Sequence, residues 1–214
     1  MSSGPDYDRY AAKMRQHLAH GVDLAVDARF VDMLANRGSR ILDIGCGPGT
    51  AVAALRARGH VAYGVDPTAV VLDIARERFD PGWYAEIDAE SLSAGTLGAA
   101  GFPSRFDVVL MAGNVPAFLG PAAFSQTFVG CTELLSPGGL LVIGTTASAQ
   151  GGPAHQDRHA LECGFTLLHR ASDWHLSPFD PDSDWSVSVF TAPGERTKGP
   201  GPDGVFILRP ATAS

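Results

Sequence analysis

Short apolar runs alternate with helix-like segments along most of this 214-residue chain. Each run is of strand length, and several end in glycine or an acidic residue, which is typical of buried strands. The predicted strands in this stretch are 40–45, 60–66, 82–88, 105–113 and 139–146. The predicted helices are 7–35 with a break at Gly21, 50–58, 68–79, 121–135 and 154–163. This alternation predicts a parallel sheet that is covered by helices on both faces.

The last two predicted strands, 165–171 and 185–192, follow a different pattern. The loop between them, 172–184, is rich in Pro, Asp and Ser and contains no helical pattern, so these two strands should run antiparallel. The predicted fold class is therefore α/β, with a doubly wound, mostly parallel, seven-stranded sheet that has one antiparallel edge strand. We expect one domain over 1–214, with a core at 38–192 and a C-terminal loop at 193–214 in which VFILRP is a candidate edge strand.

Composition narrows the classes of partner. The formal net charge is −7 and there is no run of Lys or Arg, which disfavours a nucleic-acid substrate. No apolar stretch approaches about 18 residues, and the N-terminus is polar, so we expect neither a membrane span nor a secretory signal. The three cysteines lie far apart and fit a reducing compartment. The expected protein is cytoplasmic and binds neither a membrane nor a nucleic acid.

The segment ILDIGCGPGT, at residues 41–50, places a glycine-rich turn between a strand and a helix. Its glycines are Gly45, Gly47 and Gly49. Glycines at such a turn let the backbone approach a ligand closely. A dinucleotide loop would have a third glycine where this chain has Thr50, and no P-loop lysine follows. Asp43, just before the turn, would repel a pyrophosphate but suits a ligand with an ammonium or sulfonium group.

Asp66 ends the next predicted strand, and Pro67 follows it. A carboxylate at this position can accept hydrogen bonds from both hydroxyls of a ribose. An alternative role for Asp66 as a helix N-cap is compatible with that function. Together with the glycine turn, Asp66 predicts a site for a nucleoside-type cofactor.

At this point the sequence resembles the class I S-adenosylmethionine (SAM)-dependent methyltransferases. Five segments carry the resemblance in the order in which the family has them: ILDIGCGPGT, VAYGVDP, WYAEIDAESL, FDVVLMAGNVPAFL and LLSPGGLLVIG. More narrowly, DARFVDML, AGNVPAFL and WHLSPFDPDSDWSVSVF resemble a group of small, mostly actinobacterial methyltransferase-domain proteins. The resemblance implies a Rossmann-like fold, SAM as the methyl donor, S-adenosylhomocysteine as the product, and a helical lid at residues 1–37.

The resemblance also implies roles for single residues. Asp43 would meet the methionyl amino group, with a solvated strand-end acid as the alternative. Asp88 would meet the adenine amino group and Ala89 the adenine ring through its backbone, with a surface turn acid as the alternative for Asp88. Gly113 would face the methionyl end, and Asn114 would bond to that end or to the substrate.

Two residues in the N-terminal segment are candidates for the methionyl carboxylate. Tyr10 would contact it from the lid, or would be a core aromatic residue. Arg29 would pair with a carboxylate ligand, or would form a surface salt bridge. The predicted cofactor-binding set is Tyr10, Asp43, Gly45, Cys46, Gly47, Gly49, Asp66, Pro67, Asp88, Ala89, Gly113 and Asn114.

The sequence constrains the methyl acceptor less than it constrains the cofactor. This chain has Gly-Asn-Val-Pro where amide and amine methyltransferases carry D/N-P-P-Y/F, so that substrate class has no support. His175 is the candidate general base, and no metal-ligand spacing occurs at the end of the fourth strand. A partly apolar pocket is suggested by Trp83, Val115, Phe118, Trp174 and Phe179, although core packing is the ordinary role of such residues.

We therefore expect methyl transfer to a small-molecule acceptor. The alternative is a protein of the same fold that binds SAM without transferring methyl. An NAD-dependent oxidoreductase is disfavoured by Thr50 and Asp43.

Overall fold

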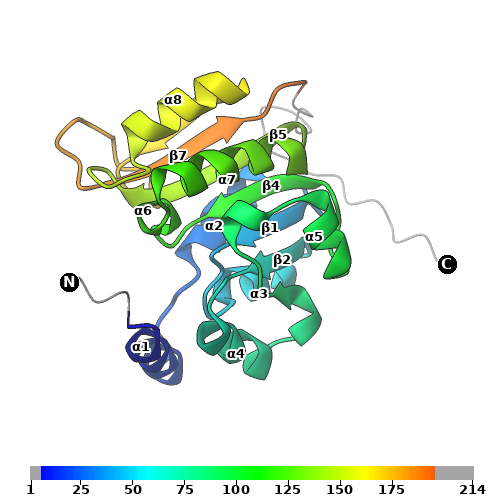
Figure 1. Cartoon of the computed structure of the whole chain (residues 1–214). Helices are drawn as coiled ribbons and strands as arrows, with labels where there is room; N and C mark the ends of the chain where they lie inside the picture. Colours follow the sequence, from blue (N-terminus) through cyan, green and yellow to red (C-terminus); the bar gives the residue numbers. More distant parts are fainter. Residues whose placement is uncertain (1–5, 196–214) are drawn as a thin grey trace.

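The computed structural model describes residues 6–195, and its centre is a seven-stranded sheet (Figure 1). The strands are β1 (Arg40–Ile44), β2 (Val61–Val65), β3 (Tyr84–Ala85), β4 (Phe106–Met111), β5 (Leu135–Thr146), β6 (Thr166–Ala171) and β7 (Trp185–Thr191). The helices are α1 (Tyr7–Ala19), α2 (Val26–Leu34), α3 (Thr50–Ala57), α4 (Ala69–Arg78), α5 (Ala94–Ala99), α6 (Val115–Phe118), α7 (Pro121–Leu134) and α8 (Pro153–Cys163). Two 3₁₀ helices, η1 (Pro81–Trp83) and η2 (Ala89–Ser91), flank β3.

The strand order is β3-β2-β1-β4-β5-β7-β6. All neighbouring pairs from β3 to β5 are parallel, whereas β7 is antiparallel to both β5 and β6. The predicted fold class, with a single antiparallel strand near one edge, is confirmed. The structure adds that β7 lies one place in from the edge, between β5 and β6. β2 and β3 lie on one side of β1, whereas β4 and β5 lie on its other side. The sheet therefore has a topological switch point between β1 and β4, where a crevice opens at the carboxyl ends of the strands.

Alternate residues of the central strands pack into two separate cores, which explains why these strands are mostly apolar on both faces. On β1, Leu42 and Ile44 pack with α5, α7 and α8, whereas Ile41 packs with α2, α3 and α4 on the other face. The same alternation recurs on β4 and β5.

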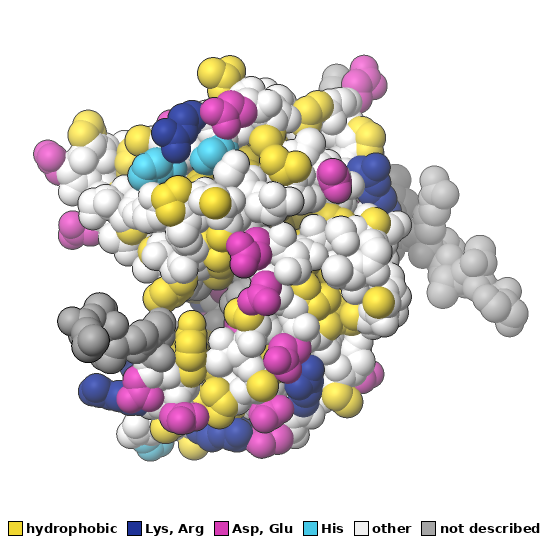
Figure 2. All heavy atoms as spheres, in the orientation of Figure 1, with side chains coloured by type: hydrophobic (Ala, Val, Ile, Leu, Met, Phe, Trp, Pro, Cys, Tyr) yellow, Lys and Arg dark blue, Asp and Glu magenta, His cyan; other side chains and the backbone are white. Residues whose placement is uncertain are grey.

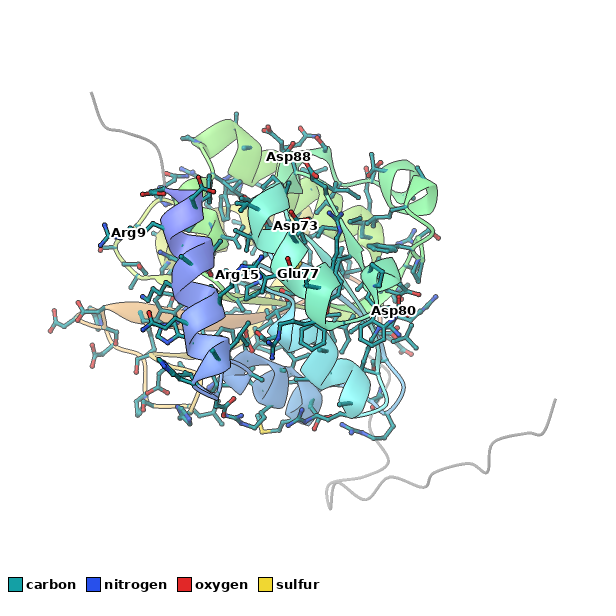
Figure 3. All side chains as sticks on the ribbon, turned by 90° about the horizontal axis from the view of Figure 1, so that it is seen from below. Arg9, Arg15, Asp73, Glu77, Asp80 and Asp88 are labelled. Carbon is teal, nitrogen blue, oxygen red and sulfur yellow. The ribbon has the colours of Figure 1, made fainter. Side chains whose placement is uncertain are left out.

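Helix α1 stands apart from both cores. It packs on α4 through a small cluster around Ala11, Val71 and Ile74. A two-pronged ion pair between Arg15 and Glu77 also joins α1 to α4 (Figure 3). Exposed ion pairs contribute little energy, so α1 is held mainly by this small apolar contact.

Two local differences from the predicted elements have physical causes. β3 is shorter than predicted because η1 begins at Pro81, where the Asp80 side chain accepts a hydrogen bond from the Gly82 backbone. β5 begins earlier than predicted because its first residue pairs with Phe106 before an irregularity in register. Helix α6 was not predicted. The expected strand at 205–210 and most of the C-terminal loop lie outside the described residues.

Within residues 6–195, no helix is long and apolar enough to cross a bilayer.

Candidate functional site

A cavity of about 510 Å³ opens at the carboxyl ends of β1, β2 and β4, at the switch point of the sheet. Its lining combines the glycine turn, the ends of the strands, and helices α1, α6 and α7. Figure 2 shows a hollow between the body of the molecule and α1, with hydrophobic side chains at its rim. The predicted residues that line it are Tyr10, Gly45, Gly47, Asp66, Pro67, Asp88, Ala89 and Gly113.

The glycine turn is left-handed at all three of its glycines, with φ of 72° at Gly45, 52° at Gly47 and 75° at Gly49. Residues with side chains rarely adopt this conformation, so the sequence is matched to the turn. A Cβ at Gly45 would lie 2.3 Å from Val115 Cγ2, and one at Gly49 would lie 2.6 Å from Tyr84 Cε1. The glycines therefore let the turn pack against β3 and α6 while its backbone faces the cavity.

Asp66 ties the turn to the next strand. One carboxylate oxygen accepts a hydrogen bond from the Gly47 backbone N–H at 3.0 Å, and the other accepts one from the Thr68 N–H at 2.9 Å. Thr68, not Asp66, is the N-cap of α4. Because a carboxylate has about four acceptor positions, Asp66 can still accept hydrogen bonds from a ligand. Burial raises the pKa of Asp66, and its two backbone hydrogen bonds oppose that rise.

Asp43 lies on β1, two residues before the turn, and is only 3% exposed. No group within the described part of the chain donates a hydrogen bond to its carboxylate. Burial, together with repulsion from Asp27 and Asp66, raises the pKa of Asp43 well above its usual range. Burial likewise raises the pKa of Asp27 to about 6. A buried acid without a partner is costly, and a cation nearby would relieve that cost.

Five predicted residues do not line the cavity. Asp43 is buried on β1. Cys46 packs against Gly64 and burial raises the pKa of its thiol, so it is a small core residue. Gly49 caps α3, and Asn114 bonds to β5. His175 is exposed on the loop that follows β6, where its backbone N–H donates to Asp173.

The structure also shows which of the remaining candidates line the cavity and which lie elsewhere. Arg29 forms an exposed ion pair with Asp23 at 2.6 Å, as its alternative role predicted. Of the suggested apolar residues, Val115 and Phe118 line the cavity. Trp174 instead packs edge-on against Phe30 at 5.4 Å.

Several lining residues were not predicted: Tyr7, Ile44, Thr68, Val71, Ile87, Glu90, Leu119, Gly120 and Ala123. Tyr7 lies one helical turn before Tyr10, so helix spacing alone could have indicated it. Tyr84 is a further supporting residue, since its buried hydroxyl donates to the Gly49 carbonyl at 3.0 Å. No local pattern in the sequence indicates that contact.

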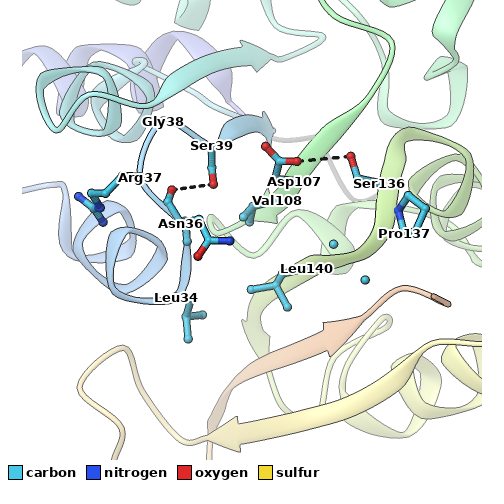
Figure 4. A pocket seen from close by; sticks show the side chains of 13 residues that line it. Leu34, Asn36, Arg37, Gly38, Ser39, Asp107, Val108, Ser136, Pro137 and Leu140 are labelled. Carbon is cyan, nitrogen blue, oxygen red and sulfur yellow. Dashed lines mark hydrogen bonds between the residues drawn. The ribbon is translucent and has the colours of Figure 1, made fainter. Parts of the chain in front are cut away.

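A second, smaller cavity of about 210 Å³ lies at the opposite ends of β1, β4 and β5 (Figure 4). Its polar groups bond to the protein itself. Asp107 accepts from the Arg40 backbone N–H at 2.8 Å and from Ser136 at 3.4 Å, and the Ser39 hydroxyl donates to the Asn36 carbonyl at 2.7 Å. This cavity therefore offers a ligand little that is not already bonded.

The larger cavity has the hydrogen-bond acceptors of a site for a nucleoside that carries a cationic group. The carboxylates of Asp66 and Asp88 line it and suit hydroxyl and amino groups, and the unpartnered Asp43, buried on β1 outside the lining, suits a cation nearby. No cluster of His, Cys, Asp or Glu in residues 6–195 is arranged to hold a metal ion.

Comparisons with known proteins agree with this geometry. A family model described as a methyltransferase domain matches residues 41–139. Methyltransferase-like protein 27 of Homo sapiens is 31% identical over 203 residues, which cover 90% of this chain and 74% of that protein. A ubiquinone biosynthesis O-methyltransferase of Cereibacter sphaeroides is 36% identical over 108 residues, but this match covers 50% of the chain and only 41% of that relative's length.

Among solved structures, a TehB-like SAM-dependent methyltransferase from Corynebacterium glutamicum superimposes with a TM-score of 0.75 and 30% identity. The match covers 86% of this chain and 97% of that one. The chain therefore belongs to the class I SAM-dependent methyltransferase family, whose methyl donor is S-adenosylmethionine.

Proposed function

We propose that this chain binds SAM in the larger cavity and transfers its methyl group to a small-molecule acceptor. The glycine turn, Asp66 and Asp88 line one cavity at the switch point of the sheet, and this observation carries the proposal. Family membership supports the same conclusion.

The residues that would hold the cofactor follow from their places around the cavity. Asp66 would accept the ribose hydroxyls, and Asp88, which follows β3, would accept from the adenine amino group. The buried Asp43 would stabilise the cationic methionyl end. Tyr10, whose hydroxyl would lie 3.7 Å from a Cβ at Gly47, would reach the carboxylate from α1.

Bound SAM supplies a methyl group on a sulfonium, which an acceptor atom displaces in line. The protein's own contribution is to align the acceptor with the donor and to exclude water. Helices α1 and α6 line the cavity from two sides and serve this purpose (Figure 1).

The lining also limits the acceptor. Its charged side chains among the described residues are all carboxylates: Asp66, Asp88 and Glu90. An acceptor with a carboxylate or phosphate would be repelled by them. Tyr7 and Phe118 line the same cavity and are 43% and 65% exposed, which favours an acceptor with an apolar or aromatic body. We therefore propose a neutral or cationic acceptor with an apolar body.

Binding without methyl transfer is the second candidate function. One observation favours it: His175, the predicted base, is exposed and lies away from the cavity lining. No other histidine lines the cavity among the described residues. An acceptor that needs a base would then have to use a carboxylate of the cavity.

Methyl transfer from labelled SAM to matched acceptor pairs tests the acceptor class. Each pair shares one aromatic ring that carries an amine or phenol, and only one member also carries a carboxylate or phosphate. We expect transfer to the uncharged member. Transfer only to the anionic members would contradict the proposed acceptor class, and tight SAM binding without transfer to any acceptor would favour the second function.

A substitution at the rim of the larger cavity sharpens this test. Phe118→Ser should raise the KM for the acceptor roughly tenfold, because the exposed ring loses its apolar contact with the substrate. Leu161→Ser, at a leucine on α8 that is 83% exposed and outside the cavity, is the matched control and should leave KM unchanged. Equal KM values for the two variants would exclude Phe118 from the acceptor site.

A further inference from the structure

Asn114 follows β4 and has a left-handed backbone, with φ of 63°. Besides Leu176, no other non-glycine residue among 6–195 has a positive φ. Asparagine tolerates this region better than most residues, but the conformation still has a cost that its surroundings must offset. The surroundings of Asn114 are therefore informative about its role.

The side chain of Asn114 ties the end of β4 to the end of β5. Its Oδ1 atom accepts a hydrogen bond from the Thr145 hydroxyl at 2.6 Å and another from the Thr146 backbone N–H at 2.8 Å. Its own backbone N–H donates to the Gly144 carbonyl at 3.2 Å. Thr145 is fully buried, so this connection is anchored in the core.

The two neighbours of Asn114 both face the cofactor cavity. Gly113 and Val115 line it, and a Val115 methyl group occupies the space where Gly45 would carry a Cβ. The connection from Asn114 to β5 therefore fixes how closely the β4 end approaches the glycine turn.

We infer that Asn114 is a positioning residue, which holds Gly113 and Val115 in place through its bonds to Thr145 and Thr146. On this inference Asn114 bonds to neither the methionyl end nor the substrate, the two roles that the family resemblance implied for it. The inference rests on the proposed function, since the cavity that it shapes is the proposed SAM site.

The geometry gives a sharp test because both side-chain bonds are accepted by the same oxygen. An aspartate can accept both bonds but cannot donate a hydrogen bond to a ligand as the amide NH₂ can. Glycine keeps the left-handed backbone and removes the side chain. N114D should therefore preserve a positioning role, and N114G should abolish it without adding backbone strain.

Binding of S-adenosylhomocysteine to the three proteins, measured by calorimetry, provides the main readout. We expect N114G to bind roughly tenfold more weakly than the wild type, and N114D to bind within about threefold of it, where 1.4 kcal/mol is tenfold. Asn36→Ala, at an exposed asparagine outside the cofactor cavity, is the matched control. N114D binding as weakly as N114G, or N114G binding like the wild type, would overturn the inference.

Hydrogen exchange of the Thr146 amide gives a second readout that does not depend on any ligand. This amide should be protected in the wild type and in N114D, and should exchange faster in N114G. If the wild type bound no S-adenosylhomocysteine, the proposed function would fail, while this exchange pattern would still decide whether Asn114 holds β5. Equal exchange in all three proteins would refute the connection itself.

Discussion

Gly49→Ala is expected to lower the free energy of unfolding by about 3 kcal/mol, from backbone strain together with overpacking. The backbone is left-handed at this residue, and a Cβ would lie 2.6 Å from Tyr84 Cε1 and 2.7 Å from Ala75 Cβ. The tyrosine ring cannot easily give way, because its hydroxyl is bonded to the Gly49 carbonyl. Urea denaturation followed by circular dichroism measures the loss.

Gly59→Ala is the matched control for that experiment. Gly59 follows α3 with a φ of 86°, but a Cβ there would meet nothing within 4 Å. Only the left-handed backbone then opposes the substitution, at about 1 kcal/mol. Equal losses in the two variants would mean that close packing around the glycine turn is not what requires Gly49.

Asp66→Ala is expected to weaken SAM binding by roughly a hundredfold, or about 3 kcal/mol. The substitution removes the proposed acceptor for the ribose hydroxyls, and it also removes the bond that holds the Gly47 N–H. Calorimetric titration of the variant with SAM measures the change, and the unfolding midpoint of the same sample shows that the protein is folded.

A nearby carboxylate outside the cavity provides the control. Asp73 on α4 is exposed and pairs with Arg76 at 3.7 Å, and it lies on the helix that follows Asp66 (Figure 3). Asp73→Ala removes the same charge from the surface and should leave SAM binding within about twofold of the wild type, because exposed pairs contribute little. If Asp66→Ala bound SAM as tightly as Asp73→Ala, Asp66 would not contact the cofactor.

The layout of the fold was predictable from the sequence because its central strands are buried on both faces. Leu42 and Ile41 point to different cores, yet both must be apolar, so β1 appears as an apolar run that only Asp43 interrupts after Arg40. The ends of such runs locate the switch point, which is why Asp66 and Asp88 were found beside the cavity. The position of a residue next to a strand end can therefore be predicted from the strand pattern alone.

Other features depend on contacts between distant segments. His175, in the loop 172–184, was the candidate general base, but it does not line the cavity, and the neighbouring Trp174 packs against Phe30 of α2. Asn114 is the N-cap of α6, and its side chain accepts a hydrogen bond from the Thr145 hydroxyl on β5. Asp43 was predicted to meet the methionyl amino group, and its burial and its position outside the cavity lining follow from packing that local spacing does not encode.

Calorimetric titration of the wild-type protein with SAM, S-adenosylhomocysteine and NADH tests most directly whether the cavity binds a SAM-type cofactor. We expect dissociation constants below about 100 µM for SAM and S-adenosylhomocysteine, and no detectable binding of NADH at the same concentrations. Failure of both adenosyl compounds to bind at millimolar concentration, or tighter binding of NADH, would show that the cavity is not a SAM site.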